Sequence, residues 1–203
     1  MLLEPDSWRV RGVISLQYNP DSFNRTLQVQ AAGVEGGSRA ESTRFKGAAV
    51  ETLKLDAEVD AADQFEFSDR HREVVEVGLA AQLAVLESLA YPASSQLRKR
   101  NSDSQSGMLE IAPMEAPLTL FVWGKNRIVP VRLTDFSITE EAFDKALNPI
   151  RAKVSLGLRV LSVDDLGFDH RGGALFMSYL QNKERLAAMV SGASMGDFGI
   201  GGL

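Results

Sequence analysis

The 203-residue chain contains no cysteine. Disulfides, thiolate catalysis and cysteine-based metal sites are therefore excluded. Histidine is scarce too, since His71 and His170 are the two in the chain, and neither has a partner at metal-ligand spacing. We expect both to be solvated or structural, and we expect no metal and no cofactor.

Long apolar runs and a basic excess are also missing. No apolar run approaches the roughly 20 residues that a membrane helix needs, and the N-terminal MLLEPDSWRVRG lacks the basic and apolar regions of a secretory signal. The net charge of −5 disfavours binding to nucleic-acid phosphates. We expect a chain made in the cytoplasm, with no membrane insertion and no nucleic-acid partner.

Alternation of apolar and polar residues predicts strands. Hydrophobic residues make up 44% of the chain and charged residues 24%, which suits a single folded domain. Residues 14–18 and 26–31 alternate on either side of the turn at 19–22, and they predict a hairpin with one buried face. The clearest strand covers 53–60, where the polar face carries Lys54, Asp56, Glu58 and Asp60.

Helical spacing appears twice. Val75, Leu79, Leu83, Leu86 and Ala90 predict a helix that starts at a cap at position 68 or 69 and ends at position 91, before a proline. Residues 175–190 predict a terminal helix with an apolar face formed by Leu175, Tyr179, Leu186 and Val190. The polar segments 33–49 and 93–107 predict long loops.

The second half is rich in strands, predicted over 118–123, 127–138 and 150–163. The last has Ser155, Gly157 and Arg159 on its polar side. This order predicts a mainly β (α+β) fold, an antiparallel sandwich or barrel with a packed helix and a C-terminal helix. We divide the chain into a β domain, residues 1–163, and a C-terminal helix with a Gly-rich tail, residues 164–203.

The stretch FVWGKNRIVPVRL superficially suggests a phosphate-binding loop. A Walker motif needs GxxxxGK[ST] between a strand and a helix, whereas here Gly124-Lys125 is followed by Asn126 and a second strand. We therefore predict a hairpin turn, since Gly and Asn tolerate the positive φ of tight turns. Trp123 is predicted to be a packing anchor, and Pro130 indicates an edge or a bulge.

Other candidate chemistry is weak. Asp56, Glu58 and Asp60 offer oxygen ligands, but alternate strand positions lack the loop curvature that wraps a calcium ion. The tripeptide at 197–199 matches a kinase metal-binding motif in letters only, because no Gly-rich loop, strand lysine or catalytic loop precedes it. We interpret the carboxylate row as a solvated sheet face, and we expect the protein not to be an enzyme.

Three stretches together carry a family resemblance. They are LQYNPDSFNRTLQVQ, with the turn Tyr18-Asn19-Pro20, then LKLDAEVDAAD, and then the long segment from Pro117 to Leu161. The long segment contains PLTLFVWG and a connection from Phe143 through Asn148-Pro149 to Arg151. In order and spacing, they resemble the tube-type proteins of phage-tail-like contractile injection systems, specifically the baseplate hub or tube-initiator group.

The resemblance implies a tail-tube-like fold and a ring, usually six-fold, between the spike and the inner tube. The implied partners are other copies of the chain, the spike protein, the inner tube or tube-initiator protein and the baseplate wedge components. The particle would be assembled in the cytoplasm of the producing bacterium. Many members carry a LysM-like module, but no such pattern follows residue 163. The predicted assembly residues are Tyr18, Asn19, Pro20, Asp56, Glu58, Asp60, Trp123, Gly124, Phe143, Asn148, Pro149 and Arg151.

Three functions are compared. The favoured one is a hub or tube-initiator ring, and the alternatives are the main inner tube protein and a small β-barrel that binds a ligand. Either the Asp56, Glu58, Asp60 face or the Ser155, Gly157, Arg159 face is expected to line the channel. The loop at 33–49 is expected to reach a neighbouring subunit or baseplate component.

Overall fold

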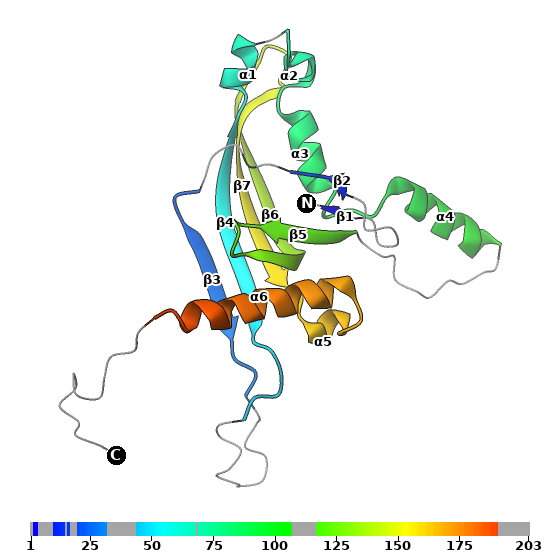
Figure 1. The fold of residues 1–203 in the computed structure, drawn as a ribbon. Helices are drawn as coiled ribbons and strands as arrows, with labels where there is room; N and C mark the ends of the chain where they lie inside the picture. The colour runs from blue at the N-terminus through cyan, green and yellow to red at the C-terminus, as the bar shows by residue number, and fades with distance from the viewer. Residues whose placement is uncertain are drawn as a thin grey trace.

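A computed structural model describes residues 2–3, 10–14, 16, 20–31, 44–67, 69–106 and 117–190. Its centre is one antiparallel sheet in the order β2-β1-β5-β6-β7-β4-β3 (Figure 1). Strands β1 and β2 (Leu2–Leu3 and Val10–Gly12) are short, and β3 covers Phe23–Gln28. The others are β4 (Val50–Asp60), β5 (Leu118–Val122), β6 (Ile128–Phe143) and β7 (Pro149–Val160). The predicted class, an antiparallel mainly β (α+β) fold with packed helices, is confirmed.

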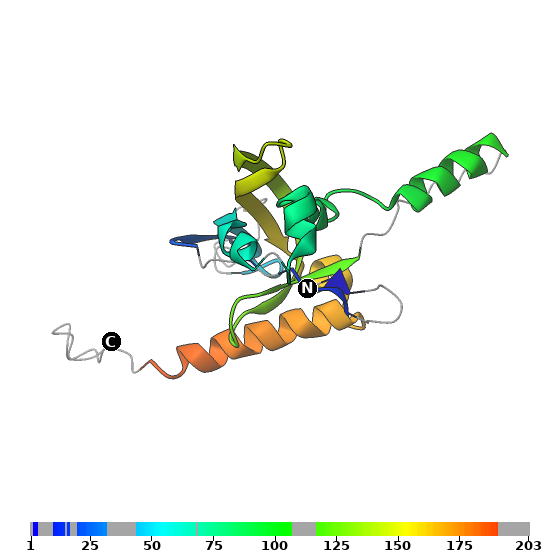
Figure 2. The same cartoon turned by 90° about the horizontal axis from the view of Figure 1, so that it is seen from above.

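The core lies on one face of β4, β7 and β6. Leu53 and Leu55 of β4 and Val154 of β7 are almost fully buried there, as the alternation predicts. Helix α3 (Ala80–Glu87) adds Leu83 and Leu86 to this core. Helix α6 (Arg171–Ala187) crosses the lower half of the sheet and packs on β6 (Figures 1 and 2).

The predicted N-terminal hairpin is wrong. Strand β3 pairs with β4, from Phe23 opposite Leu55 to Gln28 opposite Val50, and Ile14 and Leu16 lie outside any strand. Nor is one face of β3 buried, because five of its six residues are exposed. A strand at the sheet edge can alternate in sequence without covering core, since its pairing depends on a distant segment. Residues 15 and 17–18 of the predicted first strand, and residue 19 of the predicted turn, lie outside the described residues.

The predicted helix over 69–90 is two helices. Helix α2 (Arg72–Val77) begins after His71, not at the predicted cap, and α3 follows Gly78. Gly78 has φ of +58°, and a side chain there would collide with the carbonyl oxygen of Pro149. The close approach to β7 forces this break, and helical spacing alone does not reveal it. An additional short helix, α1 (Ala62–Glu66), follows β4.

The predicted loop at 93–107 is largely helical. Helix α4 (Ser94–Gln105) has no buried residue, and it stands away from the rest of the molecule (Figure 2). The side chain of Gln96 accepts a hydrogen bond from the Ala93 N–H at its start, at 3.2 Å. Because it has no apolar face, the 3.6-residue periodicity that usually identifies a helix is missing. The other predicted loop, 33–49, is described only from residue 44.

Three boundaries also differ. Strand β6 extends to Phe143, which was predicted to lie in the following connection. The terminal helix α6 covers Arg171–Ala187 and is preceded by the short helix α5 (Val163–Leu166). Its buried face is formed by Phe176 and Tyr179 with two glycines, whereas Val190 lies beyond its end and is exposed. The helix therefore begins about one turn earlier than the apolar pattern indicates.

Pro130 lies inside β6, opposite Leu120 of β5. Its carbonyl accepts a hydrogen bond from the Leu161 N–H at 2.9 Å, just beyond the end of β7. In an antiparallel strand the N–H and C=O of a residue point the same way. The side of Pro130 that lacks an N–H therefore faces the end of β7, where no strand hydrogen bond is lost. The irregularity of β6 falls later, between Leu133 and Asp135. The prediction of an edge strand or bulge at Pro130 itself is wrong.

Candidate functional site

The polar side of β4, β7 and β6 is one continuous surface, which we call the polar face. The register places Asp56 opposite Ser155 and Lys54 opposite Gly157, and Ser155 opposite Ser137 of β6. The two alternative channel faces expected from the sequence are therefore the same face. Side chains that are cross-strand neighbours on one side of a sheet lie within about 5 Å of each other, which only the pairing could establish.

The charges on the polar face are arranged in pairs of opposite sign. Arg151 lies 2.8 Å from Asp60 and 3.5 Å from Glu58, and Lys153 lies 2.8 Å from Glu141. The carboxylate row is therefore matched by cations from the neighbouring strand. Lys153 and Glu141 were missed by the sequence prediction, although their position in the alternation of β7 and β6 was available as a signal.

These contacts shift the pKa values of three groups. The pKa of Asp60 is lowered most by a hydrogen bond from the Ala62 N–H. Burial opposes this shift, and the hydrogen bond and charge of Arg151 lower the pKa further. The pKa of Arg151 is raised by its hydrogen bond to Asp60, and that of Lys153 by its hydrogen bond to Glu141. Each shift favours the charged form, so the face keeps both signs of charge at neutral pH.

A hollow of about 610 Å³ lies on the polar face. Pro20 and Asp21 stand at its margin, and Asp56, Thr139 and Lys153 are among the strand residues that line it. Within the described part of the chain, no group of His, Cys, Asp or Glu residues is placed to hold a metal ion. This arrangement is a water-compatible wall with both signs of charge.

The other predicted assembly residues lie in three places. Phe143, Asn148 and Pro149 lie at the turn between β6 and β7, next to Arg151. Trp123 and Gly124 lie at the opposite end of β6, in the turn that follows β5. Tyr18 and Asn19 lie outside the described residues.

Trp123 is half-buried in an aromatic stack. Its ring lies 4.9 Å from that of Phe23 and 5.8 Å from that of Phe121, with both pairs nearly parallel. The Arg127 guanidinium lies over the Phe23 ring at 4.8 Å. Phe23 belongs to β3 and Phe121 to β5, and three strands separate β3 from β5 in the sheet. The sheet therefore curls to bring these two rings together. Gly124 makes the turn with φ of +68° and has open space around it.

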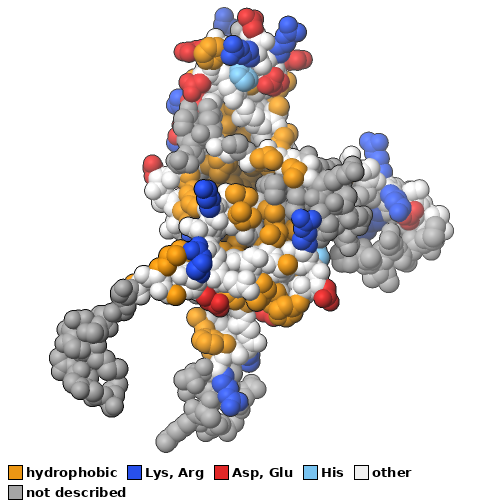
Figure 3. Space-filling model, viewed as in Figure 1, with side chains coloured by type: hydrophobic (Ala, Val, Ile, Leu, Met, Phe, Trp, Pro, Cys, Tyr) orange, Lys and Arg blue, Asp and Glu red, His pale blue; other side chains and the backbone are white. Residues whose placement is uncertain are grey.

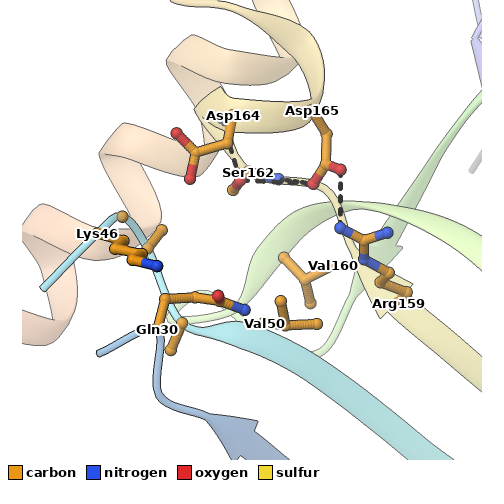
Figure 4. A pocket seen from close by; sticks show the side chains of 11 residues that line it. Gln30, Lys46, Val50, Arg159, Val160, Ser162, Asp164 and Asp165 are labelled. Carbon is orange, nitrogen blue, oxygen red and sulfur yellow. Dashed lines mark hydrogen bonds and ion pairs between the residues drawn. The ribbon is translucent and has the colours of Figure 1, made fainter. Parts of the chain in front are cut away.

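A second, smaller hollow of about 220 Å³ lies where the segment after β3 and the segment leading into β4 meet the end of β7 and α5 (Figure 4). Arg159 from the end of β7 donates to Asp165 at 2.8 Å, and Ser162 caps α5 by accepting from the Asp164 N–H at 3.1 Å. Lys46 and Gln30 enter from the other side (Figure 4). The contacts hold α5 against the sheet, and they bring together no nucleophile and base.

Glu51 is a buried acidic residue that the sequence analysis missed. Its position on the core side of β4 leaves it 2% exposed. It accepts hydrogen bonds from the Tyr179 hydroxyl at 2.9 Å and from Lys183 Nζ at 2.8 Å, both on α6. The signal was available, because Glu51 occupies an apolar position of the alternating run 51–59. It attaches the C-terminal helix to the sheet.

Both edges of the four-strand unit β6-β7-β4-β3 are open among the described residues. The outer edge of β3 has no strand partner there, and β5 covers β6 only as far as Val131, so Asp135–Glu141 is unpaired on its outer side. Since every neighbouring pair is antiparallel, β3 and β6 run in opposite directions. An open strand edge is a surface for pairing with another chain.

Three further observations bear on function. Within the described segments, no helix is both long and apolar enough to cross a membrane. Among proteins with curated descriptions, none matches this sequence. A family model described as contractile injection system tube protein matches residues 4–165.

Proposed function

Since the chain belongs to the contractile injection system tube protein family, we propose that its copies form a closed ring around a channel. Strand β3 of one copy pairs with the Asp135–Glu141 edge of β6 in the next copy. The observation that carries this proposal is the pair of open edges that run in opposite directions, because joining them keeps the sheet antiparallel all round.

The polar face then faces the channel. Ring closure places one side of the sheet inside and the core side outside, so the strand residues that meet water in the channel are those of the polar face. The paired charges of Arg151 with Asp60 and of Lys153 with Glu141 are compatible with a hydrated wall. The protein acts as a structural wall, and its predicted assembly residues position strands and turns.

The absence of cysteine allows a direct test of the seam. Thr26 of β3 and Thr139 of β6 both lie on the polar side of the sheet. The double variant Thr26→Cys/Thr139→Cys should form, on oxidation, a ladder of covalent oligomers that ends at the size of the ring. Each single variant should give at most dimers.

A matched control places the second cysteine on the exposed face of α6, as Thr26→Cys/Ser178→Cys. It should yield no ladder, because Ser178 is exposed on α6, which packs on the core side of the sheet, whereas Thr26 and Thr139 lie on the polar side. If neighbouring pairs along both strands also fail to cross-link while electron microscopy shows rings, the seam is formed by other elements. If microscopy shows no rings, the ring itself is refuted.

Which layer of the particle this ring forms is a separate question. We propose a hub or tube-initiator layer that links the spike to the inner tube and contacts wedge components, within a particle assembled in the bacterial cytoplasm. Its support is α4, which is polar on all sides and stands away from the sheet. A helix of this kind suits contacts outside the tube wall better than packing within it.

One observation favours the alternative, the main inner tube. Exposed apolar side chains lie at both ends of the long strands, including Phe45 at one end and Leu147 at the other. Apolar surfaces at both ends of a subunit suit identical rings that stack repeatedly. Electron microscopy of particles with and without this chain tests the layer. Loss of the whole tube together with long tubes from purified protein supports the main tube, whereas one missing basal layer supports the hub.

A further inference from the structure

The turn between β6 and β7 presents an exposed leucine in a strained conformation. Leu147 has φ of +65° and its side chain is 77% exposed. Left-handed backbone costs a residue other than glycine about 1 to 2 kcal/mol. Glycine or asparagine would fill such a turn at lower cost, so Leu147 is not explained by the turn itself.

Asp144 holds this turn in shape. Its carboxylate accepts from the N–H groups of Ala146 and Asn148, and from the side-chain amide of Asn148, all at 2.8 Å. The side chain of Asn148 also donates to the Glu76 carbonyl at 3.2 Å, which ties the turn to α2. These hydrogen bonds lower the pKa of Asp144. The leucine therefore projects from a preorganised support, and preorganisation reduces the entropy lost when a partner binds.

The opposite end of the sheet carries a second apolar surface. Beyond β3 and β4 the chain continues as a hairpin arm, residues 29–31 and 44–49, in which Ala31 pairs with Phe45. Val29 and Phe45 on this arm are 60% and 75% exposed. They lie at the start of β4, whereas Leu147 lies past its end, roughly 35 Å away along the strand at the usual rise per residue. Figure 1 shows the segment between β3 and β4 and the turn between β6 and β7 at opposite ends of the long strands.

We propose that Leu147 of one copy packs against Val29 and Phe45 on the hairpin arm of a second copy in the next ring. The two surfaces differ and lie at opposite ends, so the contact is head to tail and can repeat. Both are apolar, and each gains by leaving water. The inference rests on the proposed ring in its alternative layer, the main inner tube, and adds the residues through which one ring meets the next.

The test compares three variants of the full chain. Leu147→Gly removes the apolar side chain and also relieves the backbone strain. It should leave the melting temperature of the subunit unchanged or higher, yet raise the protein concentration at which rings stack at least about tenfold. Ala142→Gly is the matched control, because Ala142 also has positive φ, at +51°. It relieves similar strain without removing a large apolar group, so stacking should not change.

Phe45→Ser tests the other side of the contact. It should weaken stacking as Leu147→Gly does, and the double variant should lose little more than either single variant. Sedimentation velocity and electron microscopy measure the stacks, and thermal unfolding reports on the subunit.

Five results would overturn the contact. The first two are stacking of Leu147→Gly like the wild type, and a loss of stacking in the Ala142→Gly control that equals the loss in Leu147→Gly. The third is normal stacking of Phe45→Ser, which excludes the arm as the partner of Leu147. If the wild type forms only single rings, the contact fails while the ring and the hub layer stand. If the wild type forms no rings at all, the ring and the contact fail together.

Discussion

At the scale of single residues, Glu51 shows how a polar group joins two elements of the fold. It lies on the core side of β4, where an unpaired carboxylate would be costly. Tyr179 and Lys183 come from successive turns of α6 and satisfy both of its oxygens. The Lys183 ammonium also lies 4.1 Å from the centre of the Tyr179 ring. This cluster fixes where α6 lies on the sheet.

Removing part of the cluster should destabilise the fold measurably. We expect Glu51→Gln to lower the free energy of unfolding by about 1 to 3 kcal/mol, because Lys183 loses its charged partner in a largely covered site. Tyr179→Phe should cost about 1 kcal/mol. Urea denaturation of the single and double variants measures both effects, and the double variant should lose less than their sum.

An exposed ion pair provides the control for this prediction. Glu58 lies 3.5 Å from Arg151, and both side chains are about half exposed. Glu58→Gln should change the free energy of unfolding by less than about 0.5 kcal/mol, since solvent screens the pair. Equal effects at Glu51 and Glu58 would contradict the role given to burial.

The lowered pKa of Asp60 predicts that the free energy of unfolding depends on pH. Its pKa is lowered in the folded protein, so the native state holds the proton less tightly than the unfolded chain does. Its contribution is therefore fully present above the ordinary aspartate pKa of about 3.9, and it is lost as the pH falls through the lower folded value. Unfolding of the wild type and Asp60→Asn should differ most near pH 7. The difference should shrink progressively below about pH 4, and a constant difference over that range would refute the prediction.

At the scale of elements, the pairing of β6 with β7 depends on Gly157. The register of β6 shifts between Leu133 and Asp135, opposite this glycine. A Cβ atom on Gly157 would lie 2.7 Å from the Cβ of Asp135 and 3.2 Å from the hydroxyl of Thr134. The glycine is buried, although the alternation placed it on the polar side. The irregular strand leaves no space for a side chain there.

Gly157→Ala should therefore strain the sheet. We expect a loss of about 1 to 3 kcal/mol in the free energy of unfolding, as for other overpacked positions. Ser155→Ala, two residues away on the same face and exposed, should stay within about 0.5 kcal/mol of the wild type. Chemical denaturation of both variants measures the difference. A neutral Gly157→Ala variant would show that β6 shifts easily to make room.

The elements also differ in how they are supported. Helix α6 buries Phe176 and Tyr179 against the sheet, whereas α4 buries no residue. The face drawn in Figure 3 shows apolar side chains gathered over its centre and charged ones at the end formed by α1 and α2. Packing holds α6 in place, and α4 offers a polar surface for contacts beyond the fold.

At the scale of the whole molecule, the hairpin arm lies outside the core, so the residues that serve assembly differ from those that stabilise the fold. Its described residues, 29–31 and 44–49, extend past the start of β4, and Phe45 and Val29 are largely exposed. The core is built from β4, β6, β7, α2, α3 and α6. The loop predicted over 33–49, of which residues 44–49 are described, is expected from the sequence to reach a neighbouring subunit or baseplate component.

Replacing residues 33–43 by a short Gly-Ser turn should test this separation. The sequence predicts a loop here, and shortening a loop changes the free energy of folding by less than about 1 kcal/mol, so the subunit should unfold at nearly the same denaturant concentration. Particle assembly, followed by electron microscopy, should fail. Normal particles would show that the loop is dispensable, and an unfolded subunit would show that it belongs to the fold.

The sequence by itself determined the class of the fold, most of the strands and the family. Alternation in 53–60 and 150–160 reports local burial, because each residue faces either the core or water. It also revealed short motifs whose order resembles the family that the match over residues 4–165 now establishes.

Only the tertiary structure decided which segments pair. Strand β3 joined β4 and not the preceding segment, and two polar faces became one, since partner and register depend on residues far apart in the chain. Gly78 broke a helix because β7 passes close to it, and α4 formed without an apolar face. Periodicity records whether a residue is buried, whereas contacts between distant segments decide what buries it.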